Sequence, residues 1–271
     1  MYLDLVIGKG HDAATLQILI PMLSERLGSS TDGRILDIAS HAGTPAIPIA
    51  KTFPHASVVC TDLSTVAVNY AKQRAKDQAV CNITFQAADA QHLENFDDNS
   101  FNVTTCILGL MFMPDHKSAL QEAFRVLQPG GIYMASVWGP LPEFQAGQMI
   151  LQLMNQLMTN QPPMPPNPMT PWRFGDSEVL QQDLKDAGFS VVTCTPFSHP
   201  MKYAWADLVT FLLGPHGQLR PMLTKLKTDG RSDVDEESEE MLRSIVQDRG
   251  WICDNKVELH NTALMFTAVK T

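Results

Sequence analysis

Short apolar runs and helical patterns alternate between residues 34 and 138, and few folds accept that order. Parallel strands need connections that cross the sheet, and a helix usually makes that crossing. The alternation therefore predicts an α/β fold built on a doubly wound, Rossmann-like parallel sheet. The expected strands are 35–39, 58–62, 82–87, 101–108 and 132–138, and the expected helices are 44–50, 64–79 and 117–127.

Less regular segments flank this alternation. Residues 12–27 carry a helical apolar stripe that Pro21 is expected to break or kink. The proline-rich stretch 161–171 predicts a stiff, extended loop, and the acids of 233–240 predict a solvated helix start. Further expected elements are helices over 144–158, 177–187, 204–213 and 218–226, a short strand over 190–194, and a long final strand over 259–269.

Charge and composition limit the partners. The net charge of −9 and the lack of any run of lysines and arginines argue against nucleic acid or an anionic membrane surface. No window of 18 residues is uninterruptedly apolar, so we expect no membrane span. The first residues do not resemble a signal peptide. The five cysteines lack paired spacing, which predicts free thiols, no metal site and a cytoplasmic protein.

The loop after the first strand, 37–43, argues against a dinucleotide. A dinucleotide-binding loop needs glycines where this chain has Ala39, His41 and Thr44, and the charge of Asp37 would repel a diphosphate. An NAD(P)-dependent oxidoreductase is therefore the weaker reading. A zwitterionic amino acid fits the loop better, because backbone N–H groups can meet a carboxylate and an acid suits an ammonium group.

Two more acids follow strands at the same edge. Asp62 ends the second expected strand about 20 residues beyond the loop, where a carboxylate can accept both hydroxyls of a ribose. Asp89 follows the third strand and is placed to read the amino group of adenine. An amino acid, a ribose and an adenine together describe S-adenosylmethionine.

Five stretches in register resemble the successive motifs of class I S-adenosylmethionine-dependent methyltransferases. They are RILDIASHAG at 34–43, VCTDLS at 59–64, ADAQHL at 88–93, DNSFNVTTC at 98–106 and RVLQPGG at 125–131. FGD at 174–176 and DAGF at 186–189 are similar to a later part of the small-molecule branch that includes the ubiquinone/menaquinone C-methyltransferases. The resemblance implies a seven-stranded sheet whose last strand is antiparallel, between the fifth and sixth strands.

The resemblance also implies the cofactor contacts. Residues 37–43 would cradle the methionine moiety through Asp37, Ala39, Ser40, His41 and Gly43. The other implied contacts are Asp62 with the ribose, Leu63, Asp89 and Ala90 with the adenine, and Ile107 or Leu108 with the sulfonium region. The chain departs from the family at His41, where glycine is usual. His41 is either a tolerated loop residue or a contact to the cofactor carboxylate or the substrate.

The substrate is expected over the strand ends. We expect one methyltransferase domain over 1–271, with a cofactor-binding core at 34–138 and a helical lid at 139–232 interleaved with the sixth strand. The segments that would wall the pocket are rich in Met, Phe, Trp and Pro and favour a small apolar or aromatic metabolite. They are 1–12, 109–116, 139–175 and 197–222.

Methyl transfer needs alignment and exclusion of water more than a catalytic triad, and no triad is evident. Methyl transfer to an oxygen or carbon atom needs a proton acceptor, whereas transfer to a nitrogen or sulfur atom depends on a proton acceptor much less. Candidates for a base or a substrate contact are His11, His41, His116, His199 and Tyr203. A non-catalytic methyltransferase-like binding protein is the alternative from another class. The oligomeric state stays open, with a homodimer among the options.

Overall fold

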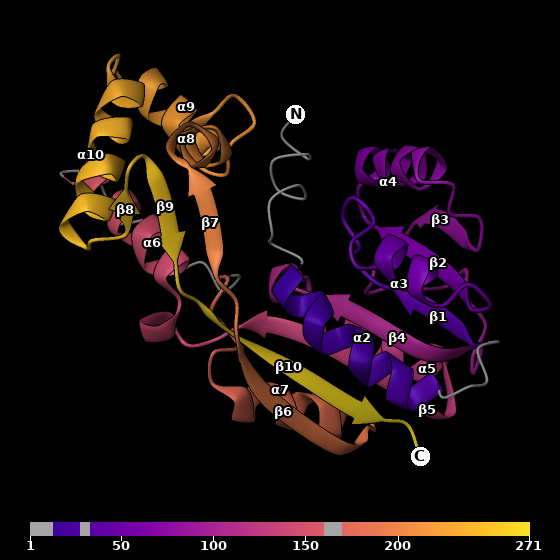
Figure 1. Ribbon diagram of the computed structural model, residues 1–271. Coiled ribbons are helices and arrows are strands. Elements are labelled where there is room, and N and C mark those ends of the chain that lie inside the picture. Colours follow the sequence, from indigo (N-terminus) through magenta and orange to yellow (C-terminus); the bar gives the residue numbers. More distant parts are fainter. Residues whose placement is uncertain (1–12, 28–32, 160–169) are drawn as a thin grey trace. The chain divides into compact units, whose positions relative to one another are not determined.

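Seven strands form the main sheet of the computed structural model, which describes residues 13–27, 33–159 and 170–271 (Figure 1). Their order is β3-β2-β1-β4-β5-β10-β6. The first five pair in parallel and β10 is antiparallel to β5, as expected for a doubly wound sheet with one reversed strand. The strands are β1 (Arg34–Asp37), β2 (Ser57–Asp62), β3 (Ile83–Ala87), β4 (Phe101–Ile107), β5 (Leu127–Trp138), β6 (Ser190–Ser198) and β10 (Thr262–Val269).

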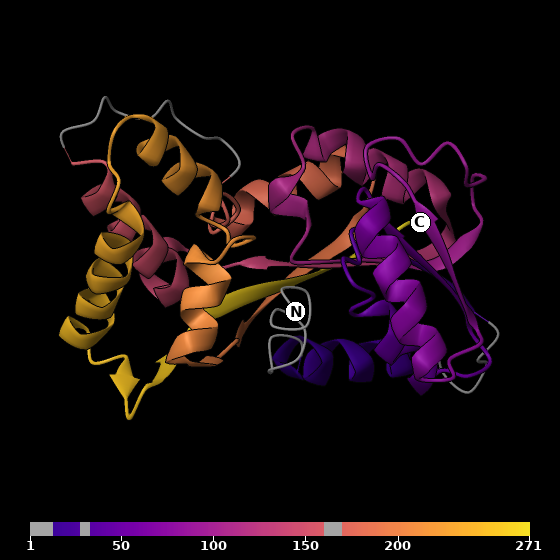
Figure 2. The ribbon, with the colours of Figure 1, turned by 90° about the horizontal axis from the view of Figure 1, so that it is seen from above.

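Helices cover both faces of this sheet. Seen from above, α2 (Ala13–Leu27), α3 (Ala46–Thr52) and α4 (Thr65–Asp77) lie on one face, while α5 (His116–Val126) and α7 (Ser177–Asp186) lie on the other (Figure 2). The core between the layers is mainly apolar, and Phe101, Tyr133 and Phe266 are among its largest fully buried side chains. Burial of such large side chains is the main favourable term in folding.

The chain divides into two compact units. The sheet unit comprises the described parts of Asp12–Pro140, Pro168–Phe197 and Thr262–Thr271. The helical unit comprises the described parts of Leu141–Asn167 and Ser198–Asn261. It therefore extends past the insert expected at 139–232. It contains a small antiparallel sheet of order β7-β9-β8, formed by β7 (Met201–Ala204), β8 (Ile252–Cys253) and β9 (Lys256–Leu259).

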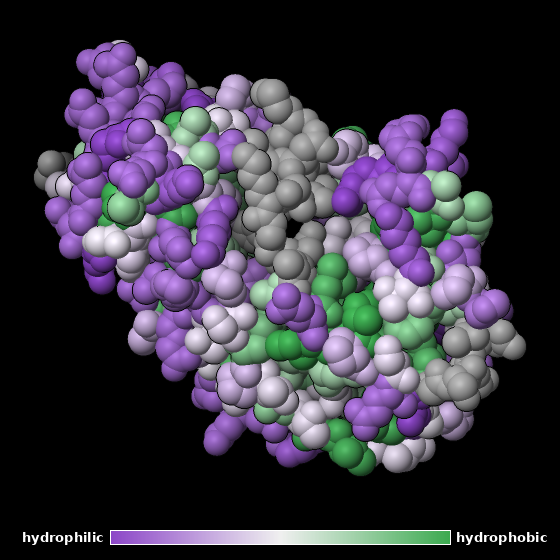
Figure 3. Space-filling model, in the orientation of Figure 1, coloured by the Kyte–Doolittle hydropathy of each residue, from purple (hydrophilic) through white to green (hydrophobic). Residues whose placement is uncertain are grey.

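The helices of the helical unit are amphipathic. They are α6 (Gln145–Leu157), α8 (Trp205–Leu213), α9 (Arg220–Thr228) and α10 (Val234–Asp248). The first turn of α10 carries Asp235, Glu236 and Glu237, which suit the positive end of the helix dipole. Figure 3 shows mostly hydrophilic side chains over this helix on the face in view. The acidic run is thus the helix start that the sequence predicted.

The structure corrects two expectations about the elements: the helix is not broken at Pro21, and the expected final strand is divided. A single helix, α2, runs across Pro21. Leu19 and Leu23 are fully buried on its inner face, and this packing outweighs the hydrogen bond that proline cannot make. The expected final strand 259–269 is two strands in two different sheets, β9 and β10, which are interrupted at Asn261.

Asn261 explains that interruption. The side chain is 3% exposed, accepts a hydrogen bond from the Ala146 N–H at 3.0 Å and donates one to the His199 carbonyl at 3.1 Å. The same residue's backbone carbonyl accepts from the His199 N–H at 2.7 Å. Ala146 and His199 are 115 and 62 residues away from Asn261 in the sequence. The run that looks like one strand in the sequence is therefore interrupted where the Asn261 side chain bonds these distant partners.

Candidate functional site: the carboxyl ends of four parallel strands

The predicted cofactor residues follow four neighbouring strands of the sheet unit. β1 ends at Asp37, β2 at Asp62, β3 at Ala87 and β4 at Ile107. These strands are parallel and adjacent in the order β3-β2-β1-β4, so their carboxyl ends share one edge. In open α/β sheets, ligands bind outside this edge. The fold thus brings the loops of the predicted cofactor site together.

Asp62 connects the end of β2 to the loop after β1. One carboxylate oxygen accepts from the backbone N–H of His41 at 2.8 Å, and the other accepts from that of Ser64 at 2.9 Å. The neighbouring Ser40 N–H donates to the Thr61 carbonyl at 2.8 Å. An ionised carboxylate has about four acceptor positions, so Asp62 retains room for hydroxyl donors. Leu63, next in the chain, is 73% exposed at this edge.

The loop after β1 is tightly wound. Ala39, His41 and Gly43 have φ values of +56°, +51° and +86°. At Gly43 an added Cβ would lie 2.7 Å from Ile47 Cδ1, so only glycine fits. Arg74, on α4, donates to the Ala42 carbonyl at 2.5 Å and fixes the other side of the loop. His41 adopts the left-handed conformation with an exposed side chain, in the position where its family resemblance leads us to expect glycine.

Asp37 lies beneath this loop and has no exposed surface. The Thr105 hydroxyl donates to one of its oxygens at 2.5 Å, and the Ala46 N–H donates to the other at 3.2 Å. Burial raises the pKa of this carboxyl to about 7. Asp37 therefore supports the loop and the start of α3 from within the protein, and the predicted contact with an ammonium group stays a prediction.

Asp89 and Ala90 stand at the start of the long connection after β3. The Asp89 carboxylate accepts from the backbone N–H of Gln91 at 2.9 Å and from its side-chain amide at 3.0 and 3.2 Å. These hydrogen bonds hold the pKa of Asp89 below its usual value, and the one from the Gln91 side chain has the largest effect. The carboxylate is only partly buried and carries the negative charge that a donor such as an amino group would meet.

Ile107 and Leu108 end β4 beside the loop after β1. Leu108 has a φ of +52° and its N–H donates to the Ser136 carbonyl at 2.9 Å. A Cβ on the following Gly109 would lie 2.8 Å from the Ala39 Cβ, so the two loops are in close contact. The predicted neighbours of the methionine moiety and of the sulfonium are therefore adjacent.

His116, a candidate base, has both ring nitrogens occupied. Its Nε2 pairs with Asp183 at 2.7 Å and its Nδ1 accepts from the Arg173 guanidinium at 2.5 Å. Lys117 also pairs with Asp183, at 3.0 Å, and the His116 ring packs edge-on against Phe174. This cluster fastens α5 to α7, so the structure gives His116 a structural part.

Two other candidate bases, His199 and Tyr203, belong to the helical unit. His199 is fully buried in the helical unit, where its backbone pairs with Asn261. Tyr203, also buried there, stacks on Phe211 with ring centres 5.9 Å apart. His11 lies outside the described residues, and so do parts of the segments 1–12 and 139–175 that were expected to wall the pocket. Their roles toward a substrate stay predictions.

Sequence reasoning missed the side chains that hold the loops. Arg74, Gln91 and Arg173 make their contacts across 30 or more residues or through a loop that has no periodic pattern. Gln91 lies inside one of the quoted motifs, two positions after Asp89. A side-chain amide so close to an acid in the sequence was the one signal that could have predicted their hydrogen bond. No comparable signal marked Arg74 or Arg173.

Other features of the described residues bear on what the chain can bind. No group of three or more His, Cys, Asp or Glu side chains within 13–27, 33–159 and 170–271 is arranged to hold a metal ion. Over the same ranges no helix is long and apolar enough to cross a membrane. Cys60 and Cys106 are buried free thiols, and burial raises the pKa of each to about 12. Cys81 and Cys253 are exposed.

A topologically complete seven-stranded sheet with acids after β1, β2 and β3 defines the class: a Rossmann-like fold of the methyltransferase type. Residues 35–131 match the family model described as a methyltransferase domain. Over these residues the chain is therefore similar to class I, S-adenosylmethionine-dependent methyltransferases such as the ubiquinone/menaquinone C-methyltransferases.

Relatives with similar sequences match less than half of the chain. An uncharacterized protein of Mycobacterium tuberculosis is 36% identical over 118 residues, which are 44% of this chain and 42% of that protein. A ubiquinone/menaquinone biosynthesis C-methyltransferase of Rickettsia prowazekii is 34% identical over 117 residues, 41% of this chain and 47% of that enzyme. The matched region thus spans less than half the length of these curated relatives.

Solved structures are similar over nearly the whole chain. The YcgJ protein of Bacillus subtilis is 19% identical, with a TM-score of 0.61 over 94% of this chain and 98% of that one. Phosphoethanolamine N-methyltransferase 2 of Haemonchus contortus, solved with S-adenosyl-L-methionine, is 18% identical, with a TM-score of 0.56 over 94% of this chain and 52% of that one. At these identities the similarity establishes the fold.

Proposed function

We propose that this protein transfers a methyl group from S-adenosylmethionine to an O, N, S or C atom of a small, apolar or aromatic metabolite. The observation that carries the proposal is the row of groups along one sheet edge. Asp62 beside the exposed Leu63 suits a ribose and an adenine, Asp89 suits the adenine amino group, and the wound loop 39–43 suits an amino acid. The methyltransferase names of the relatives support the same reading.

The residues of the chain have limited tasks in such a reaction. The cofactor, when bound, supplies a methyl group that its sulfonium already activates. Asp62, Leu63 and Asp89 would hold the nucleoside, and the backbone of 39–43 would hold the amino acid. Their work is to orient the methyl group and exclude water, which is the larger part of catalysis when the donor is activated. His116, with both nitrogens engaged, is not assigned a proton.

Substituting Asp62 tests the proposal. Asp62→Ala removes the acceptor for two ribose hydroxyls and releases the His41 N–H, so we expect binding of S-adenosylhomocysteine to weaken by about 2 kcal/mol, or roughly thirtyfold. Isothermal calorimetry measures it. Asp77→Ala is the matched control, because Asp77 is an exposed acid farther along α4 whose carboxylate accepts from the Gln73 side chain.

Two results would contradict the proposal in different ways. Unchanged affinity in Asp62→Ala would mean that the end of β2 does not bind the ribose. No binding at all by folded wild-type protein would remove the methyltransferase function and favour the non-catalytic alternative, for which the unusual His41 is the specific observation.

The surroundings of the reaction are also proposals. A cytoplasmic location is supported by the five free cysteines, and fractionation of cells tests it. A homodimer stays a prediction, and light scattering of the purified chain tests it.

A further inference from the structure

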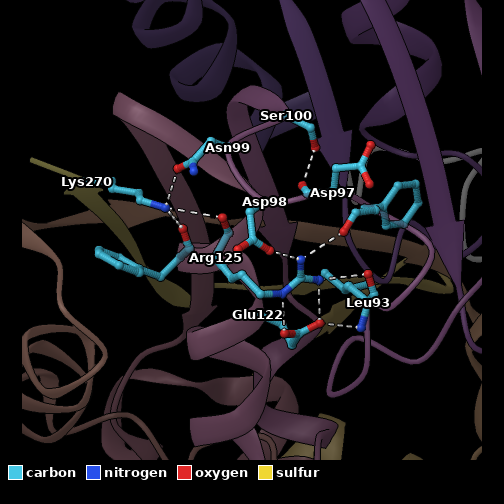
Figure 4. A network of polar contacts seen from close by, with 10 residues as sticks. Leu93, Asp97, Asp98, Asn99, Ser100, Glu122, Arg125 and Lys270 are labelled. Atoms are coloured by element: carbon cyan, nitrogen blue, oxygen red, sulfur yellow. Dashed lines mark hydrogen bonds and ion pairs between the residues drawn. The ribbon is translucent and has the colours of Figure 1, made fainter.

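The connection between β3 and β4 has little regular structure of its own and is held mainly by α5. Glu122 accepts the Leu93 N–H at 2.6 Å, while Arg125 donates to the Leu93 and Phe96 carbonyls at 2.9 Å each. Figure 4 shows Arg125 between Glu122, Asp98 and Leu93, with the three segments drawn together around the guanidinium group. This clamp fixes the far part of the connection, beyond the adenine-reading residues.

Gln91 fixes the near part. Its side-chain carbonyl accepts the backbone N–H of Asp115, the N-cap residue of α5, at 2.7 Å. Its side-chain NH₂ donates to both oxygens of Asp89, at 3.0 and 3.2 Å. One amide thus connects the start of a helix, a rigid element, to the carboxylate that follows β3.

That connection constrains the direction of the Asp89 carboxylate. A partly exposed aspartate otherwise samples several rotamers, and ordering it on binding costs free energy. The backbone N–H of Gln91 bonds one oxygen and its side-chain amide nitrogen is shared between both, so Gln91 occupies one side of the carboxylate and leaves acceptor capacity on the other. Since the carboxylate cannot turn without losing contacts to Gln91, the remaining acceptor position is fixed in space.

We propose that Gln91 is a positioning residue that holds the Asp89 carboxylate toward the amino group of adenine and so sets the preference of the site for adenine. The inference rests on the proposed function, because it requires S-adenosylmethionine at this edge. Adenine presents an amino donor where hypoxanthine presents a carbonyl oxygen. A fixed carboxylate accepts from the first and repels the second, whereas a mobile carboxylate turns away from the oxygen and discriminates less.

The test compares S-adenosylhomocysteine with S-inosylhomocysteine, whose base has a carbonyl oxygen in place of the amino group and a proton on N1. We expect wild-type protein to bind the first at least about tenfold more tightly, as sites that hydrogen-bond a donor do. In Gln91→Met, which keeps the side-chain length and lacks the amide, this ratio should fall by about three- to tenfold. In Asp89→Ala the ratio should approach one, and adding Gln91→Met to Asp89→Ala should not lower it further.

Gln73→Met is the matched control. Gln73 makes the same kind of contact, an amide to the Asp77 carboxylate at 2.7 Å, on the exposed side of α4. Its ratio should equal that of wild type. The ratio of the two affinities is informative because a loss of fold stability lowers the affinity for both ligands equally and leaves their ratio unchanged.

The outcomes separate this inference from the proposed function. An unchanged ratio in Gln91→Met, or an equal loss for both ligands, overturns the role of Gln91 while the wild-type affinity still supports the methyltransferase. Absence of wild-type binding to either ligand overturns both. If Gln91→Met does not fold, Gln91→Ala takes its place, and failure of both variants to fold overturns the proposal, since Gln91 would then hold the fold itself.

Discussion

Asp37 should make the stability of the protein depend on pH. Burial raises its folded-state pKa to about 7, whereas an exposed aspartate titrates near 3.9. Deprotonation therefore favours the unfolded chain. The free energy of unfolding is highest, as far as Asp37 determines it, below about pH 4, where the carboxyl is protonated in both states. It declines as the pH rises to about 7 and does not change further above that.

The isosteric variant Asp37→Asn isolates this effect. Between pH 5 and pH 8 wild-type protein should lose about 2–3 kcal/mol of unfolding free energy relative to the variant, because only wild type has the carboxyl to deprotonate. Urea denaturation of both proteins at both pH values measures the difference. An equal difference at pH 5 and pH 8 would show that Asp37 keeps an ordinary pKa in the folded protein.

A substitution at His41 tests the role of this side chain in the loop after β1. His41→Gly should leave the affinity for S-adenosylhomocysteine unchanged within about twofold, because glycine keeps the N–H that bonds Asp62 and adopts a φ of +51° without strain. Calorimetry on the variant and wild type is sufficient. A large loss of affinity would instead identify the imidazole ring as a ligand contact.

Whole strands and helices were more predictable than their exceptions. The Val, Ile and Cys runs of β2 and β4 are buried on both faces, so their apolar pattern is strong and local. The acids that follow β1, β2 and β3 could be placed because they come at or just after the ends of such apolar runs. Pro21 within α2 and the break at Asn261 depend on partners far along the chain, which no periodicity reveals.

The break between β9 and β10 gives a prediction at this scale. Asn261→Ala should destabilise the protein by about 1–3 kcal/mol, because it leaves the buried Ala146 N–H and the His199 carbonyl without the amide. Asn155→Ala, on the exposed side of α6, is the control and should be nearly neutral. Urea unfolding curves compare the three proteins. A neutral effect at Asn261 would mean that water or a shifted backbone replaces the amide.

For the whole molecule, the division into two units limits what sequence could anticipate. The shared location of the candidate cofactor residues could be predicted because they belong to one unit and follow neighbouring strands, while their contacts with the cofactor stay predictions. The candidate bases could not be ranked, because His199 and Tyr203 belong to the helical unit, whose chain arrives from several separate segments. The partners of His116 could not be predicted either, because Asp183 and Arg173 are 57 or more residues away in the sequence.

The central claim is methyl transfer to a small molecule, and release of S-adenosylhomocysteine measures it most directly. Purified protein is given S-adenosylmethionine with pools of small apolar and aromatic metabolites, and with RNA and DNA as a contrast. We expect release with at least one metabolite pool, none above background with nucleic acid, and a strong reduction by Asp62→Ala at a cofactor concentration below its weakened Kd. Binding of S-adenosylmethionine without release in any pool, or release driven by nucleic acid, would contradict the account.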